Sequence, residues 1–569
     1  MNISEFFSLL KLCWIRAGGK LNLLILITFF TTILELIGFG MVIPLINLSF
    51  SEGPSQPSDF SNFINKIFSD FGFLLNFNLV LLTIVIIFLC KGFFVFLGNN
   101  LQIWLTTGIR KSIQNQIISL YEKVEYRYFL SKRIGDHTNV LIRECERYQT
   151  VVNNISKGFV ALTSAFFFIL TLTILDTYFF IFLVIFSFLI FYVFVPIIKK
   201  TKIFSFSNVK LYSNLNASLI ELIQNYSYLK GTFRTEKFTR TIYDVTDQIV
   251  KINRRLGVFS NILGTIKEPI GVLIIASLIF FKVSILNEPL PEVLVLGLIL
   301  YRVTQKIMEI QNHWQRLNES IAGVFHIEEV IKELNNQQEK IGKSKKVDLT
   351  KKIEFKNVDF SYDKRIIIKN CSLTINPKEI IGIKGKSGEG KTTFIKLIMK
   401  LVEPNRGKIF FGSTDSIDIF ANSIRSGVGY VTQDVNLFNG TLRENISFWD
   451  HQSSNLERKL KKSMDLAGCL DLFDRIDENV GDQALKLSGG QKQRVLIARE
   501  IFKEPKILIF DEPTSSLDLK NEITIKKTIK YLKKKYTVVL ISHRASLLEI
   551  SDSLYVLRKG KMMLQQKKK

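Results

Sequence analysis

The stretch Gly385-Lys386-Ser387-Gly388-Glu389-Gly390-Lys391-Thr392 decides the fold of the C-terminal part of the chain. An apolar strand pattern (Ile380, Ile381, Ile383) precedes it, and apolar residues at helical spacing (Phe394, Leu397, Ile398, Leu401) follow it. A glycine-rich loop between a strand and a helix lets backbone N–H groups and the helix N-terminus surround a polyphosphate. The sequence therefore predicts an α/β P-loop domain that binds a nucleoside triphosphate, although the loop alone is also found in unrelated nucleotide-binding proteins.

Two further motifs follow downstream in a fixed order. They are Leu487-Ser488-Gly489-Gly490-Gln491 and the apolar strand Ile507-Leu508-Ile509-Phe510 that ends in Asp511-Glu512. With these residues the chain resembles the ATP-binding cassette (ABC) superfamily, from about Lys351 to the C-terminus. In that family, the signature of one cassette closes over the ATP held by the phosphate loop of a second cassette.

The N-terminal half is apolar and predicts membrane spans. A spanning helix needs about 20 mainly apolar residues, and six segments come near that length. They are about Leu21–Asn47, Leu79–Leu97, Phe159–Leu175, Tyr178–Pro196, Pro269–Ser284 and Val293–Met308. The fifth is short and carries Lys282, so a buried core helix is its alternative.

We therefore expect an all-α polytopic membrane domain, with six transmembrane helices and long cytoplasmic extensions, followed by an α/β P-loop cassette. The expected divisions are an N-terminal interfacial helix in 1–20, the membrane domain in 21–312, a linker in 313–350 and the cassette in 351–569. The apolar run that follows residues 1–20 contains Glu35 and Pro44 and lacks an obvious cleavage site, so we expect an uncut first helix.

The net charge of +25 could suggest a nucleic-acid partner, but the topology explains it better. The connections between spans alternate between acidic ones and ones dense in Lys and Arg, as the positive-inside rule requires. We expect no nucleic acid, and a multi-pass protein of the bacterial inner membrane with the cassette and both termini in the cytoplasm. The five cysteines are scattered, without metal or disulfide spacing.

The two inner connections, Gly98–Gly158 and Ile197–Glu268, are long and carry helical apolar spacing, for example Ile109, Ile113, Ile117 and Leu120. Folded as helical hairpins, they would reach about 45 Å beyond the bilayer. This layout resembles the half-transporters of ABC exporters. By that resemblance, tips near Arg127–Asp136 and Asn208–Asn216 would be coupling helices, and the alternative is that they are solvated turns.

An apolar stripe of helical period runs from Phe60 to Phe71 in the first outer connection. An external helix here, together with Glu35–Gly40 running into Pro44, resembles the bacterial flippases of lipid-linked oligosaccharides. Charges within spans are costly and usually face a cavity or a partner. Lys91 and Arg302 could therefore line a cavity for an anionic headgroup, or they could pair with an acid such as Glu35.

Phosphoryl transfer to water needs positioning and charge neutralisation. Lys391 is expected to reach the β- and γ-phosphates, and the Thr392 hydroxyl to bind Mg²⁺. Asp511, at the end of an apolar strand, is expected to hold Mg²⁺ or its water, and Glu512 to act as the base for the attacking water.

The resemblance implies further roles in an ATP- and Mg²⁺-dependent site. Tyr362 would stack on adenine, Gln433 would contact Mg²⁺, and His543 would touch the γ-phosphate. The expected ATP-binding set is Tyr362, Gly385, Ser387, Gly388, Gly390, Lys391, Thr392 and Thr393. The set expected to act on the ATP of the opposing subunit is Ser488, Gly489, Gly490, Gln491 and Asp518.

One chain carries both a full phosphate loop and a full signature, so a homodimer is the economical expectation, with a heterodimer as the alternative. We expect the chain to be an ATPase that drives an exporter or flippase. Its expected substrate is a lipid-linked oligosaccharide or another lipid-like molecule, which it would move across the bilayer. Export of peptides or hydrophobic drugs is the alternative. Two alternative functions belong to other classes. One is a soluble-type cassette that acts on DNA or ribosomes, and the other is an ATPase-inactive scaffold or a channel.

Overall fold

The computed structural model describes residues 14–45, 76–339 and 347–567, apart from short gaps, and not the side chains of 177–198. The chain divides into two compact units. One consists of Met1–Val124 with Tyr128–Gln338, and the other of Glu125–Arg127 with Glu339–Lys569. The expected domain boundaries stay predictions.

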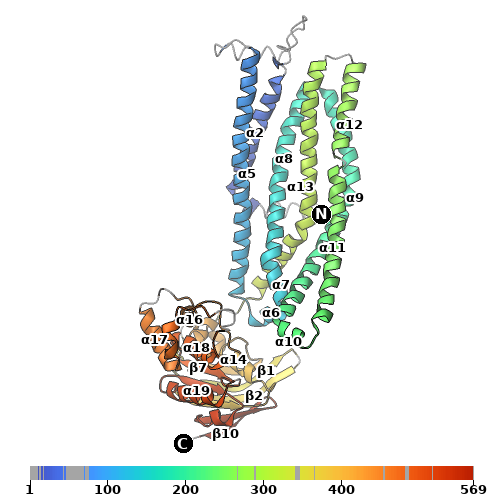
Figure 1. Ribbon diagram of the computed structural model, residues 1–569. Helices are drawn as coiled ribbons and strands as arrows, with labels where there is room; N and C mark the ends of the chain where they lie inside the picture. The colour runs from blue at the N-terminus through green and yellow to red at the C-terminus, as the bar shows by residue number, and fades with distance from the viewer. Residues whose placement is uncertain are drawn as a thin grey trace. The chain divides into compact units, whose positions relative to one another are not determined.

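The first unit is helical (Figure 1). Five of the six predicted spans overlap a single helix each, and the fifth overlaps a helix and the π-helix that follows it. In chain order the elements are α2 (Gly19–Gly40), α5 (Phe77–Tyr121), α6 (Tyr126–Ser131), α7 (Ile134–Asn139), the π-helix η1 (Val140–Glu144), α8 (Cys145–Leu175), α9 (Thr177–Gln224), α10 (Tyr226–Gly231), α11 (Thr235–Thr265), α12 (Lys267–Phe280), the π-helix η2 (Phe281–Ile285) and α13 (Leu290–Asn336).

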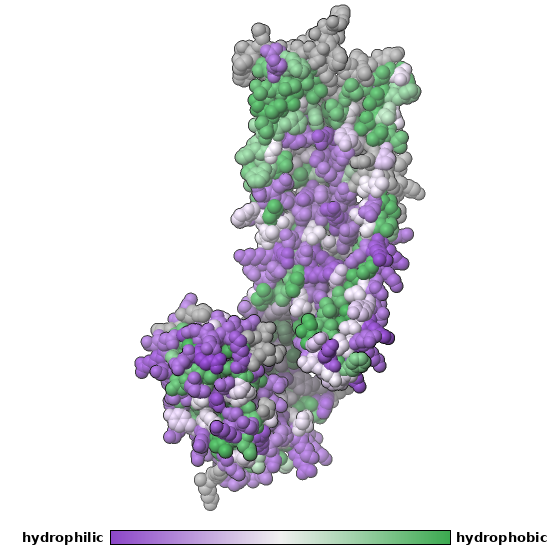
Figure 2. Space-filling view, in the orientation of Figure 1, coloured by the Kyte–Doolittle hydropathy of each residue, from purple (hydrophilic) through white to green (hydrophobic). Residues whose placement is uncertain are grey.

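Among the described residues, three helices are long and apolar enough to cross a membrane: Gly19–Gly40, Phe77–Tyr121 and Ile134–Ile174. In the fifth predicted span, the apolar helix found among the described residues is shorter, Ile275–Ile285. Figure 2 shows hydrophobic residues gathered at one end of the helical unit and mainly hydrophilic residues along the rest of its length. The apolar end is the part suited to lipid.

The long inner connections are helical hairpins, as predicted. With 45 residues, α5 is about 68 Å long, which is more than twice the roughly 30 Å hydrocarbon thickness of a bilayer. Ile109, Ile113, Ile117 and Leu120 are buried together against α8 and α13 in one core. The spacing of four and three residues therefore marks the packed face of this extension.

The predicted position of the second inner tip is wrong. Residues 208–216 lie within the 48-residue helix α9, and the chain turns only after Gln224, through Asn225 and the short helix α10. Helical propensity and apolar spacing continue through 208–216, so nothing there ends the helix. The expected outer helix from Phe60 to Phe71 lies outside the described residues, as does most of the expected N-terminal interfacial helix.

The second unit is an α/β domain built on two sheets. The six-stranded sheet has the order β10-β9-β3-β8-β7-β6, and the four-stranded sheet has the order β2-β1-β4-β5. The strands are β1 (Ile353–Tyr362), β2 (Arg365–Ile375), β3 (Ile380–Lys384), β4 (Arg406–Phe411), β5 (Thr414–Asp415), β6 (Val428–Val431), β7 (Ile507–Asp511), β8 (Thr537–Ile541), β9 (Ser553–Arg558) and β10 (Lys561–Lys567).

The helices of this unit are α14 (Lys391–Ile398), α15 (Ala421–Arg425), α16 (Leu442–Ser447), α17 (Leu456–Ala467), α18 (Gly489–Phe502), α19 (Leu519–Leu532) and α20 (Ala545–Leu548), with 3₁₀ turns η3 (Ser416–Asp418) and η4 (Leu470–Arg475). Strands β6, β7, β8, β3 and β9 run parallel. The central strands β3, β7 and β8 are nearly continuous buried apolar runs because helices and loops cover both faces of such a sheet. The loops after these strands meet at one edge, which positions the site.

Candidate functional site

A cavity of about 600 Å³ at the carboxyl edge of the parallel sheet gathers most of the predicted nucleotide-binding residues. The phosphate loop follows β3, His543 follows β8, Asp511 ends β7 and Gln433 follows β6. These four strands are neighbours, so their ends deliver the side chains to one place. The lining residues are Arg365, Ile367, Ser387, Gly388, Gly390, Lys391, Thr392, Thr393, Gln433, Asp511, Glu512, Ser515, His543 and Arg544.

The phosphate loop is folded tightly by its glycines. Gly388 and Gly390 have φ angles of 80° and 104°, a region that residues with a Cβ rarely adopt. A Cβ at Gly390 would lie 2.8 Å from the Ile367 side chain. The Glu389 carboxylate accepts a hydrogen bond of 2.6 Å from the Lys386 backbone N–H. The loop thus presents successive backbone groups at the start of α14, an arrangement that suits a phosphate.

Lys391 connects the loop to the predicted catalytic residues. Its buried ammonium donates to the Gly385 carbonyl at 2.7 Å and lies 3.2 Å from Oε1 of Glu512. It also contacts Nε2 of His543, and that nitrogen is 3.3 Å from Oε1 of Glu512. A lysine, a carboxylate and an imidazole from three separate elements therefore converge on one point.

The backbone at Glu512 is unusual. Its φ angle is 50°, in the left-handed region that costs a non-glycine residue free energy. Its N–H donates to the Ile541 carbonyl at 3.0 Å, which ties it to the end of β8. The neighbouring strand thus holds the Glu512 carboxylate toward the cavity.

Asp511 is buried at the end of β7, and Oδ2 accepts a hydrogen bond of 3.2 Å from the Tyr430 hydroxyl. Burial raises the pKa of Asp511, and the charge of Glu512 adds to the effect, while the Tyr430 hydrogen bond opposes it. Burial also raises the pKa of Tyr430. Burial disfavours the ionised form of a carboxylate, and a cation beside it stabilises that form. Asp511 and the Thr392 hydroxyl are oxygen ligands of the kind Mg²⁺ prefers, so the residues fit the expected ion.

Two predicted nucleotide contacts do not line this cavity. Tyr362 ends β1, and its ring packs edge-on against Phe360 with centres 4.9 Å apart. Gly385 contributes its carbonyl to Lys391. The roles proposed for them with adenine and phosphate stay predictions.

The signature residues begin helix α18 and are not among those lining the cavity of their own chain. Ser488 is the N-cap: its hydroxyl accepts from the Gln491 N–H at 3.3 Å, and the Gln491 side chain accepts from the Ser488 N–H at 2.9 Å. Asp518 caps α19 by accepting from the Asn521 N–H at 2.9 Å. A Cβ at Gly490 would lie 2.6 Å from the Asn521 side chain. Signature and phosphate loop are thus two separate surfaces, and the predicted action on a second subunit stays a prediction.

The sequence reading missed Tyr430, Arg365, Ser515 and Arg544. Arg544 directly follows His543, and Ser515 comes shortly after Glu512, so adjacency to a candidate could have found these two. Tyr430 in a strand and Arg365 at the start of another carry no spacing signal. Sheet order brings Tyr430 to the site, and the packing of the second sheet brings Arg365.

In the helical unit, Glu35 pairs with both candidate cations. Its Oε2 lies 3.0 Å from Nζ of Lys91, and its Oε1 lies 3.3 Å from Nε of Arg302. The Glu35 side chain is 8% exposed, whereas that of Arg302 is 40% exposed. The structure therefore shows Lys91 and Arg302 paired with an acid, which was one of the two interpretations of these cations. One carboxylate between two cations leaves an excess of one positive charge.

Two family models match the chain. The model described as the ABC transporter covers residues 368–515, and the one described as the ABC transporter transmembrane region covers residues 24–308. A solved structure of a bacterial Atm1-family ABC exporter with ATP bound has a TM-score of 0.76 and 23% identity, and the match covers 96% of this chain and 94% of that one. This likeness shows the fold and confirms the predicted fold class.

The curated relatives are named for several different activities. The heterocyst differentiation ATP-binding protein HepA of Nostoc is 28% identical over 80% of this chain and 75% of its own length. An ATP-dependent lipid A-core flippase of Syntrophus aciditrophicus is 32% identical over 47% of this chain and 44% of its own length. The leukotoxin translocation protein LktB of Mannheimia haemolytica is 35% identical over 47% and 38%. The alignments span less than half the length of the last two relatives.

Proposed function

Because the chain belongs to the ABC transporter family and joins its transmembrane region to its ATP-hydrolysing cassette, we propose that it is an ATP-driven exporter or flippase of lipid-like substrates. A lipid-linked oligosaccharide is the first candidate. The observation that carries this choice is the group formed by Glu35, Lys91 and Arg302, which we call the membrane charge triad. It places surplus positive charge among apolar helices.

The membrane charge triad suits an amphipathic anion. Glu35 satisfies part of the charge of Lys91 and Arg302, and the cations also lie against aromatic rings. Arg302 is 5.3 Å from the ring centre of Phe39, and Lys91 is 5.4 Å from that of Phe88. A phosphate or pyrophosphate headgroup would bind the exposed guanidinium, while its lipid part would contact the surrounding apolar helices. The surplus charge is offset when such an anion binds.

The proposed reaction is hydrolysis of ATP between two cassettes. The phosphate-loop N–H groups and Lys391 hold the β- and γ-phosphates, while Thr392 and Asp511 hold Mg²⁺. When bound, this ion supplies neutralisation of phosphate charge. Water attacks the γ-phosphorus, its proton passes to the Glu512 carboxylate, and the bond from phosphorus to the ADP oxygen breaks, releasing ADP and phosphate.

A dimer follows from the two separate surfaces of the cassette. Ser488 and the rest of the signature would complete the ATP site on the partner's phosphate loop. A homodimer is favoured since one chain carries both surfaces, and a heterodimer is the alternative. The first inner tip contributes to coupling in this proposal: Arg127, which groups with the cassette unit, lies 4.7 Å from the Phe360 ring centre.

The proposed location is the bacterial inner membrane, with the cassette on the cytoplasmic side together with both termini. The positive-inside pattern of the inner connections supports this orientation. Export of peptides or hydrophobic drugs is the second candidate, and the similarity to a relative named for leukotoxin translocation favours it.

The test is ATP-dependent movement in proteoliposomes. A fluorescent lipid-linked glycan, a fluorescent peptide and a cationic dye are compared with the wild-type protein, Glu512→Gln and Arg302→Gln. We expect glycan movement that needs Glu512 and falls at least tenfold in Arg302→Gln, while ATP hydrolysis persists in the latter. Movement of the peptide or dye in preference to the glycan would replace the first candidate by the second. No ATP-dependent movement of any of the three would overturn the proposal.

A further inference from the structure

A second cavity, of about 440 Å³, lies within the helical unit and is distinct from the membrane charge triad. Residues of α5, α6, α7, η1, α9 and α13 line it together. Its volume is within the usual range for sites that take small organic molecules, roughly 300 to 1,000 Å³. It is therefore large enough for a ligand that none of the functions above requires.

One side of this cavity is apolar and aromatic. Phe206 of α9 and Phe325 of α13 lie nearly parallel, with ring centres 6.3 Å apart and an angle of 17° between the planes. Val140, at the start of the π-helix η1, also lines it. A π-helical turn is uncommon and often occurs at functional sites. These walls would favour a flat or short apolar group.

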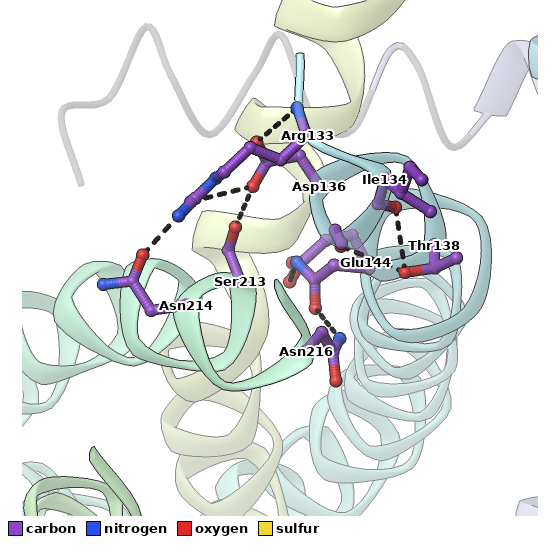
Figure 3. Close-up of polar contacts among 10 residues, drawn as sticks. Arg133, Ile134, Asp136, Thr138, Glu144, Ser213, Asn214 and Asn216 are labelled. Atoms are coloured by element: carbon purple, nitrogen blue, oxygen red, sulfur yellow. Dashed lines mark hydrogen bonds and ion pairs between the residues drawn. The ribbon is translucent and has the colours of Figure 1, made fainter. Parts of the chain in front are cut away.

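Most charges around the cavity already have partners. Arg133 binds Asp136 at 3.2 Å and Asn214 at 3.1 Å, and Ser213 donates to the same Asp136 carboxylate (Figure 3). The Asp136 carboxylate thus accepts hydrogen bonds from both Ser213 and Arg133 and is committed to these partners. Lys132 is held by Glu333 at 2.9 Å.

Among the described residues, three side chains at the cavity, Lys210, His326 and Glu329, have no partner of this kind. Lys210 of α9 forms no salt bridge with any residue that the structure describes, although it lines the cavity. Nδ1 of His326, on α13, is buried and lacks a hydrogen-bond partner among the described residues. A buried polar atom without a partner costs about 1–3 kcal/mol. A ligand oxygen beside Lys210 would remove that cost once the His326 ring turned this nitrogen toward the cavity.

We propose that this cavity binds a small amphipathic anion, an apolar or aromatic body with one carboxylate or phosphate ester. The body would lie against Phe206 and Phe325, and the anionic oxygens would contact Lys210 and His326. Glu329 also lines the cavity and is exposed, so a cationic ligand would be drawn there, away from Lys210. The anionic class is favoured because two of the three side chains left unpartnered among the described residues, Lys210 and His326, can donate hydrogen bonds to one anion. The binding is independent of the proposed transport.

The test measures binding of 2-naphthyl phosphate, 2-naphthoate, neutral 2-naphthol and cationic 2-naphthylammonium to the full chain in nanodiscs, by equilibrium dialysis without nucleotide. Empty nanodiscs correct for partition into lipid. We expect saturable binding of at least one anion, and Lys210→Met to weaken it about tenfold, the worth of one charged hydrogen bond. Phe325→Ala is expected to weaken binding of the same anion because the aromatic wall is lost.

Lys200→Met is the matched control, since Lys200 is also an exposed lysine of α9 but does not line the cavity. It should bind like the wild type. Binding of only the carboxylate or only the phosphate ester supports the site and selects the headgroup. Naphthol or the ammonium binding as tightly as the anions, an unchanged affinity in Lys210→Met, or no saturable binding would overturn the proposal, whatever the result of the transport assay.

Discussion

Nζ of Lys391 lies 3.2 Å from Oε1 of Glu512, so the phosphate-loop lysine and the proposed base form one salt bridge in the cassette. Changing Glu512 to Gln keeps the shape of this side chain and removes its ability to accept a proton. We expect ATP turnover to fall about a hundredfold or more, with ATP binding retained. Turnover of the purified protein, together with binding of labelled ATP, measures both effects.

Glu504→Gln is the control for that change, because Glu504 is exposed and does not line the cavity. It should leave turnover unchanged. Full turnover in Glu512→Gln would show that another group accepts the proton.

Asp511 should make the stability of the protein depend on pH. Burial raises its pKa, while the unfolded residue ionises near its ordinary value of about 3.9. Between these two values the folded state binds more protons, so this group lowers the unfolding free energy as pH rises. Asp511→Asn should therefore raise the melting temperature near pH 7, and by less as pH falls toward 4.

Thermal denaturation of the full chain in detergent, without Mg²⁺, measures this prediction across that pH range. Tyr430 can still donate its hydroxyl to the side-chain amide oxygen of the Asp511→Asn variant, so the comparison isolates the charge. A variant no more stable than the wild type at pH 7 would contradict it.

Loss of the Glu35 carboxylate from the membrane charge triad should lower the stability of the protein. Glu35→Gln removes the carboxylate that Lys91 and Arg302 share. Since Glu35 is buried while the two cations are partly exposed, the cost should lie between about 1 kcal/mol for an exposed pair and about 3 kcal/mol for a buried one. We expect a clear loss of thermal stability in detergent. Glu309→Gln is the control, because its pair with Lys306, 2.9 Å long, is more exposed and contributes at most about 1 kcal/mol. Equal losses in both variants would argue against a structural role of the triad.

Gly135 of α7 lies directly against Ala217 of α9. A Cβ there would lie 2.5 Å from the Ala217 backbone, and backbone atoms cannot move aside cheaply. Gly135→Ala should therefore destabilise the protein by about 1–3 kcal/mol. Gly108→Ala, in α5 with nothing within 4 Å of its would-be Cβ, should gain about 0.5–1 kcal/mol from helix propensity. Melting temperatures of the two variants should shift in opposite directions.

Cys371 and Cys469 should resist alkylation in the folded protein. Burial raises the pKa of each thiol to about 12, and the thiolate is the reactive form. We expect N-ethylmaleimide near pH 8 to modify them only after denaturation, as read by mass spectrometry of cassette peptides. The same peptides from protein denatured before labelling serve as the reactive reference. Rapid labelling of Cys371 without denaturant would be inconsistent with this packing.

Local sequence was sufficient for the features that depend on neighbours in the chain. The phosphate loop lies between β3 and α14 as predicted, since its glycines are needed wherever the backbone must take positive φ. The packed face of α5 was also predictable, because helical period alone brings Ile109, Ile113 and Ile117 to one side. Where an end signal was weak, as at Asn225, local pattern failed and the second inner tip was misplaced by more than two helical turns.

Long-range packing decided the rest. Strand order, which no local spacing encodes, brings Tyr430 to Asp511 and His543 to Lys391. The helix packing likewise gives Glu35 two cations, where the residue types alone left pairing and an open cavity as equal alternatives. The physical reason is that charges far apart in the chain lower each other's free energy only once apolar burial has brought their elements within a few ångströms, so their partners are a property of the folded core.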